Sequence, residues 1–124
     1  QVDGDTVDRT VARADFALRL FHLHAEGMGL VMFAGGVMIR AFLASPSLSK
    51  ALYVMLGVGG FAYPFGYLAW SLMIPGLGLD RSKDLAEYLF WIPFGGAALA
   101  AMGVIALVLA LDLVRSSRRE RTVA

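Results

Sequence analysis

Two histidines, the only ones in the chain, stand two residues apart at the head of a long apolar run. His22 and His24 lie in the stretch RLFHLHAEGMG, in which Glu26 and Met28 follow at the same two-residue spacing. Imidazole, carboxylate and thioether groups can bind metal ions, and the first two can also carry protons. This stretch therefore holds the first candidate chemistry of the chain.

A regular α-helix separates these groups into two faces. It turns by about 100° per residue, so His22 and His24 point to nearly opposite sides and cannot bind one metal ion together. One face is a polar seam at positions i, i+4, i+7 and i+11, made of Asp15, Arg19, His22 and Glu26. We expect Arg19 to pair with Asp15 or Glu26, and Glu26 either to be a structural partner or to handle protons. His24 shares the other face with Met28.

The elements that position these residues are predicted to be membrane helices. Hydrophobic residues make up 58% of the 124, against about 45–50% in a soluble domain. Ala51 to Leu79 and Tyr88 to Leu111 contain no charged residue, and each run exceeds the roughly 20 residues that cross a bilayer. We predict an all-α membrane protein, a single membrane domain over residues 1–124, with three transmembrane helices near residues 19–44, 51–74 and 86–114.

The segment before the first span has a different pattern. Apolar side chains recur there at helical spacing, at Val7, Val11, Ala14 and Leu18. We expect an amphipathic helix over residues 5–18, which either lies along the membrane surface or continues into the first span. Because the chain begins with Gln1 and not with Met, a fourth span or a cleaved signal before it stays open.

Charge sets the expected orientation. Arg40 and Lys50 flank the first link, and arginines fill the carboxyl-terminal tail, whereas the amino-terminal segment and the second link mix acids and bases. The positive-inside rule then places the amino terminus outside and the carboxyl terminus in the cytoplasm, in a bacterial inner membrane. The chain has no cysteine, which excludes thiolate metal sites, and no nucleotide-binding loop. We expect contact with lipid and no nucleic-acid partner.

The other spans offer aromatic and small residues. Tyr63 and Tyr67 stand one turn apart beside Pro64, deeper than the interfacial belt to which Trp91 and its neighbours are assigned. Phenols at that depth could bond a haem propionate or a quinone carbonyl. Pro64 and Pro93 should kink their spans. Glycines on all three spans are expected to let helices approach closely.

Imidazole on a transmembrane helix is a common axial ligand of haem iron. The stretch FHLHAEGMG resembles the His-x-His helix of haem–copper oxidase and nitric oxide reductase catalytic subunits, and that of small bacterial HxH membrane proteins. The resemblance implies axial-ligand roles for His22 and His24. With no further histidine, this chain supplies neither a bis-histidine pair across two helices nor a copper site of that family. A six-coordinate haem would need a methionine of this chain, another copy or a partner subunit.

These observations give one leading hypothesis and three alternatives. The leading one is a small subunit of a respiratory or electron-transfer complex, not a stand-alone enzyme, in which His24 or His22 ligates haem b near the outer face. The first alternative is a cofactor-free accessory subunit that docks onto other membrane subunits or onto its own copies. The second contributes to a quinone site. The third is a Cu(I) site made of His24, Met28 and Met32.

Overall fold

The structure, a computed structural model, describes residues 4–123, with side chains described as far as Ser116. Helices account for nearly all of this range and no strand occurs in it: α1 Gly4–Phe42, α2 Pro46–Ala62, α3 Phe65–Leu77, α4 Leu79–Ala86, the π-helix η1 Glu87–Gly95 and α5 Gly96–Val123. Three helical passes are long and apolar enough to cross a membrane, at residues 4–42, 46–77 and 79–116. The predicted all-α membrane fold is confirmed.

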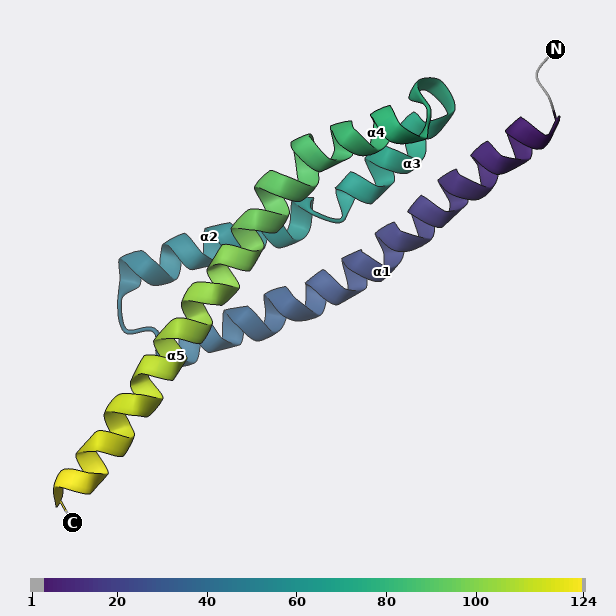
Figure 1. The fold of residues 1–124 in the computed structure, drawn as a ribbon. Coiled ribbons are helices and arrows are strands. Elements are labelled where there is room, and N and C mark those ends of the chain that lie inside the picture. The colour runs from purple at the N-terminus through teal and green to yellow at the C-terminus, as the bar shows by residue number, and fades with distance from the viewer. Residues whose placement is uncertain (1–3, 124) are drawn as a thin grey trace.

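The three passes alternate in direction (Figure 1). The long helix α1 makes the first pass, α2 and α3 return beside it, and α4, η1 and α5 make the third. Helix α1 packs mainly on α2 and α3, and α2 packs also on α5 and η1. The far end of α5 extends beyond the α1–α2 turn, so one end of the bundle is a single helix.

The turns follow from local sequence signals. The Ser45 side chain accepts a hydrogen bond from the Leu48 N–H at 3.4 Å, and Pro46 opens α2, where a missing N–H costs nothing. Between α3 and α4, Gly78 adopts φ +77°, a conformation that favours glycine. Helix α3 runs through Pro75 and Gly76, three residues beyond the predicted end of the span at residue 74, and Gly78 ends it.

Both later passes are interrupted inside the predicted spans. The helix breaks at Tyr63 and Pro64, which separate α2 from α3, and Pro93 lies within the π-helix η1. Proline has no N–H to donate and its ring clashes with the preceding turn, so the α-helical ladder cannot pass through either residue unchanged. The α-helix is therefore interrupted at both places where a kink was expected, and the predicted spans 51–74 and 86–114 are not regular α-helices.

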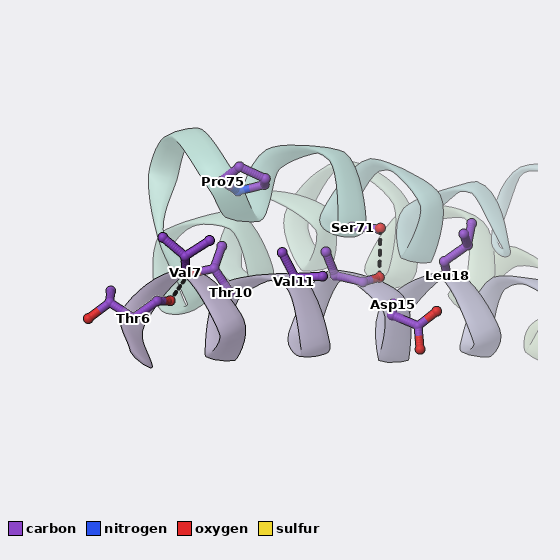
Figure 2. Close-up of a pocket in the computed structure, with 9 residues that line it drawn as sticks. Thr6, Val7, Thr10, Val11, Asp15, Leu18, Ser71 and Pro75 are labelled. Carbon is purple, nitrogen blue, oxygen red and sulfur yellow. Dashed lines mark hydrogen bonds between the residues drawn. The ribbon is translucent and has the colours of Figure 1, made fainter. Parts of the chain in front are cut away.

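The amphipathic helix predicted over residues 5–18 is the first part of α1 and continues directly into the span. Its apolar face lies along α3, where Ser71 Oγ donates a 2.8 Å hydrogen bond to the Ala14 carbonyl (Figure 2). Ser71 is buried, so this bond satisfies a hydroxyl inside the bundle and joins the two helices. A shallow groove of about 610 Å³ runs along this contact, lined in part by Val7, Val11 and Leu18.

Close helix contacts replace a thick core. The buried cluster is small and joins α1, α2 and α5 through Ile39, Leu52, Leu56, Ala101 and Ile105. Next to it, α2 comes so close to the third pass that a Cβ on Gly59 would lie 2.6 Å from the Phe94 carbonyl oxygen and 2.8 Å from the Ala98 nitrogen. In lipid such van der Waals contact is a main source of helix association.

We expect Gly59→Ala to destabilise the bundle and Gly57→Ala to leave it unchanged or slightly more stable. The first methyl group meets fixed backbone, and overpacking of this kind typically costs about 1–3 kcal/mol. The second enters open space in the same helix, where alanine is the better helix former. Thermal unfolding in detergent micelles, followed by circular dichroism, measures both. Equal midpoints for the two variants would contradict the close α2–α5 contact.

Candidate functional site

The structure separates the two histidines as the helical geometry predicts. His24 is partly buried and turns toward the second pass, whereas His22 is exposed on the outside of the bundle. Phe21 packs edge-on against the His22 ring, with 5.5 Å between centroids. His24 is therefore the histidine that the fold places in contact with other helices.

A backbone hydrogen bond orients the His24 ring. Its Nδ1 lies 2.8 Å from the Leu20 carbonyl oxygen, one turn earlier in α1. A carbonyl can only accept, so Nδ1 carries the hydrogen, and in the neutral ring Nε2 keeps its lone pair. This is the arrangement that presents an imidazole for metal ligation or for accepting a proton.

An aromatic column continues from His24 across the bundle; we use this name for His24, Tyr67, Trp91 and Trp70. The His24 and Tyr67 rings are stacked, with centroids 4.2 Å apart and planes 25° from parallel. Tyr67 contacts Trp91 at 4.7 Å, and Trp91 meets Trp70 edge-on at 5.9 Å. All three passes contribute, so the column exists only in the folded bundle.

The two predicted tyrosines form a hydrogen-bonded pair beside His24. Their hydroxyl oxygens are 3.2 Å apart, and the Tyr63 ring lies 5.7 Å from the His24 ring. In such a pair one phenol donates to the other, which leaves one hydroxyl hydrogen free for a further acceptor. Tyr63 and Tyr67, selected from sequence for their depth and their place beside Pro64, are thus brought together with His24.

A lateral apolar groove of about 680 Å³ opens beside this group, between α1 and the third pass. Its lining is mainly apolar, with polar atoms only from a few side chains; it consists of His24, Met28, Val31, Tyr63, Trp91, Ile92, Gly95, Gly96, Ala98, Leu99 and Met102. A long apolar cleft with a few polar groups at one place is typical of ligand sites. The predicted pairing of His24 with Met28 on one face holds here, because both line this groove.

The remaining seam residues lie elsewhere. Arg19 Nε donates to Asp15 Oδ2 at 2.8 Å, which confirms one of the two expected pairings. His22 and Glu26 are exposed, and the described residues give Glu26 no hydrogen bond or ion pair. The seam thus faces away from the other passes, and Glu26 does not meet the His24 groove.

The described residues contain no cluster of three or more His, Asp or Glu side chains that could hold a metal ion. Of the methionines in the copper alternative, Met28 lines the groove and Met32 does not. Both pack over Gly60, where a Cβ would lie 2.7 Å from Met32 Sδ and 3.3 Å from Met28 Cε. What the groove offers a metal is one imidazole with thioethers along its wall.

The sequence did not single out the partners of this group. Trp91 was assigned to the interfacial belt, yet its ring belongs to the aromatic column. The Trp91 N–H is buried and has no acceptor among the described residues, so Trp91 contributes only its ring to the groove. Gly66 makes room for that ring, and Gly95 makes room for Tyr63, since a Cβ there would lie 2.8 Å from Tyr63 Cδ2. One sequence signal could have located these contacts: Gly66 and Gly95 each follow an intramembrane proline by two residues.

Gly66→Ala should displace Trp91 and change the tryptophan emission, because the added methyl group would lie 2.6 Å from Trp91 Cδ1. Gly76→Ala, whose methyl group enters open space in the same helix, should leave the emission unchanged. Fluorescence of the purified protein measures both, and Trp91→Phe should abolish the difference. An unchanged spectrum for Gly66→Ala would contradict the position of Trp91.

The arrangement can therefore do limited and definable chemistry. It presents one imidazole nitrogen, one free phenol hydrogen and an apolar wall. Such a set can bind a flat or amphiphilic molecule by its polar end and can ligate or hydrogen-bond it. No protein-family model, curated protein or solved structure matches the chain.

Proposed function

We propose that the chain is a small membrane subunit of an electron-transfer assembly and holds one haem b in the groove beside His24. The observation that carries the proposal is the state of the His24 ring. Its Nδ1 is held by the Leu20 carbonyl while the ring borders an apolar groove, so Nε2 is the nitrogen available to iron.

The groove walls fit a flat apolar group. Gly96 exposes its backbone on one side, since a Cβ there would meet nothing within 4 Å. Val31 and Leu99 extend the apolar lining away from the polar end. The lining of the groove is thus mainly apolar, as the face of a porphyrin requires.

The ligand set favours one axial bond from this chain. Met28 lies one turn from His24 on the same helix, so it cannot stand on the opposite side of an iron that His24 binds. Met102 packs near Gly35, about three turns further along α1 than His24. Any further ligand would come from another copy or another subunit.

Each side chain of the site then has a task. Haem b would supply reversible one-electron chemistry. The Leu20 carbonyl fixes the tautomer and the ring orientation of His24. The free phenol of the Tyr63–Tyr67 pair can donate to a propionate. Trp91 and Met28 cover the polar end and keep water away.

The proposal includes a sidedness. Arg40 and the carboxyl-terminal arginines mark cytoplasmic ends in a bacterial inner membrane, which places the amino terminus and the His24 end of the groove toward the outer face. The haem would then exchange electrons with a donor or acceptor on that side.

The two histidines give a sharp test. We expect His24→Ala to lower the haem content at least ~10-fold, since even changes behind a metal ligand cost 10–100-fold, whereas His22→Ala keeps it. Gly96→Leu should also lower it by filling the groove, and Gly103→Leu, which enters open space outside the groove on α5, serves as its control. Absorption spectra of protein purified from haem-supplemented membranes measure the haem content.

The outcomes separate the alternatives. Haem bands that survive His24→Ala, or that are lost with His22→Ala instead, would overturn the proposal. A colourless wild-type protein that remains folded would favour the cofactor-free accessory subunit.

A second candidate, quinone binding, is favoured by one specific observation. The Tyr63–Tyr67 pair leaves a phenol hydrogen beside a neutral imidazole, and a quinone needs a donor for its carbonyl and a group that carries protons. An isoprenoid tail could follow the apolar wall toward lipid. The proton role that the sequence suggested for Glu26 or His22 does not belong to this site, because both lie on the opposite face of α1.

For this candidate we expect Tyr67→Phe to weaken quinone binding about two- to tenfold, the value of one hydrogen bond. Tyr88→Phe, an exposed position on η1 outside the groove, should not change it. Quenching of Trp91 fluorescence by a short-tailed quinone measures the affinity. If Tyr67→Phe and Tyr88→Phe bound the quinone with the same affinity, the Tyr63–Tyr67 pair would not be part of the binding site. The absence of quenching in the wild-type protein would reject quinone binding.

A further inference from the structure

The outward face of α1 carries ionisable groups at a depth where lipid is expected. The stretch from Arg19 to Arg40 is about 30 Å long at ~1.5 Å per residue, which matches the hydrocarbon core of a bilayer. Glu26 lies about 10 Å inside from Arg19 on that scale. Its side chain is exposed, and the described residues give it no hydrogen bond or ion pair. An intramembrane carboxylate is costly unless protein or water covers it.

These groups belong to a longer stripe with a definite spacing. We call it the outer stripe of α1; it consists of Asp15, Arg19, His22, Glu26, Gly29 and Phe33, which alternate by four and three residues. All six residues are exposed, and Phe33 is 70% exposed. A four–three alternation keeps one seam of a helix facing a second helix along its whole length. Gly29, with open space around it, lets the second helix come close.

The charges of the stripe indicate which helix fits. Acid, base, imidazole and acid follow one another, so each acid has a basic group one turn away. In a pair of parallel α1 helices related by a two-fold axis, each residue stands level with its own counterpart and one turn from the next stripe residue of the other copy. Glu26 of each copy can therefore reach His22 of the other, and this contact occurs twice. Arg19 and Asp15 already pair within one chain, so Glu26 is the acid for which a second copy supplies a base.

We propose that the outer stripe is a homodimer interface in which His22 and Glu26 of one copy pair with Glu26 and His22 of the second copy. The surface lies opposite the His24 groove, so the dimer leaves that groove open. The proposal does not rest on haem or quinone binding, so the outcomes of the haem-content and quinone-affinity experiments do not decide it.

Cross-linking through introduced cysteines tests the surface, because the chain has none of its own. Phe33→Cys lies within the stripe. Phe61→Cys is its matched control, since Phe61 is 65% exposed on α2 and its neighbour Gly60 packs against Met32 at a similar depth. On oxidation in isolated membranes we expect a disulfide-linked dimer with Phe33→Cys and at least ~10-fold less with Phe61→Cys. Equal yields for the two variants would overturn the proposal.

A charge exchange tests the identity of the partner in the Phe33→Cys background. His22→Glu alone places acids against acids, so we expect the dimer yield to fall at least ~10-fold. Adding Glu26→His restores acid–base pairs between the two helices only if the facing helix also carries His22→Glu and Glu26→His. Only a second copy of the same chain meets this condition. Recovery of the dimer in the double variant supports the proposal. Failure to recover, while circular dichroism shows an intact fold, assigns the stripe to a different protein and overturns it.

Discussion

The structure depends on one constraint: inside a bilayer no water is present to hydrogen-bond a backbone group that loses its partner. Nearly the whole described chain obeys it by being helical. Pro64 and Pro93 depart from it, and each interrupts its pass, one as a break between α2 and α3 and the other within a π-helix. The two interruptions face each other, because Gly95 lies against Tyr63 and Gly66 lies against Trp91. The aromatic residues of the site gather where the regular backbone is broken, as often occurs at π-helical segments in functional sites.

Small residues make this meeting possible. Without a hydrophobic driving force between helices in lipid, contact depends on how closely two backbones can approach. Gly59 brings α2 against the start of α5, and Gly66 and Gly95 admit large rings into the space between passes. The cost is a thin core, since few side chains are fully buried and many large apolar ones face outward. Such a bundle is well suited to further contacts with lipid, a cofactor or another chain.

Helix α1 divides its chemistry between two faces. His24 and Met28 face the groove, and His24 stacks on Tyr67 there. His22 and Glu26 face outward, with the Arg19–Asp15 ion pair one turn before them. The two-residue spacing of the histidines is what separates them, because about 200° of helix rotation lies between their side chains. One short stretch can thus serve a cofactor on one side and an interface on the other without conflict.

Sequence by itself determined the fold class, the three apolar passes, the interruptions at Pro64 and Pro93 and the opposite directions of His22 and His24. These follow from composition, run length and helical periodicity, which are local properties. The tertiary structure alone decided which histidine enters the bundle, that Tyr67 stacks on it, and that Trp91 belongs to the same column and not merely to an interfacial belt. Those contacts join residues from three passes, and the rotation of each pass about its axis is set by packing against its neighbours. That packing depends on where single glycines allow close approach, which no periodicity within one helix can specify.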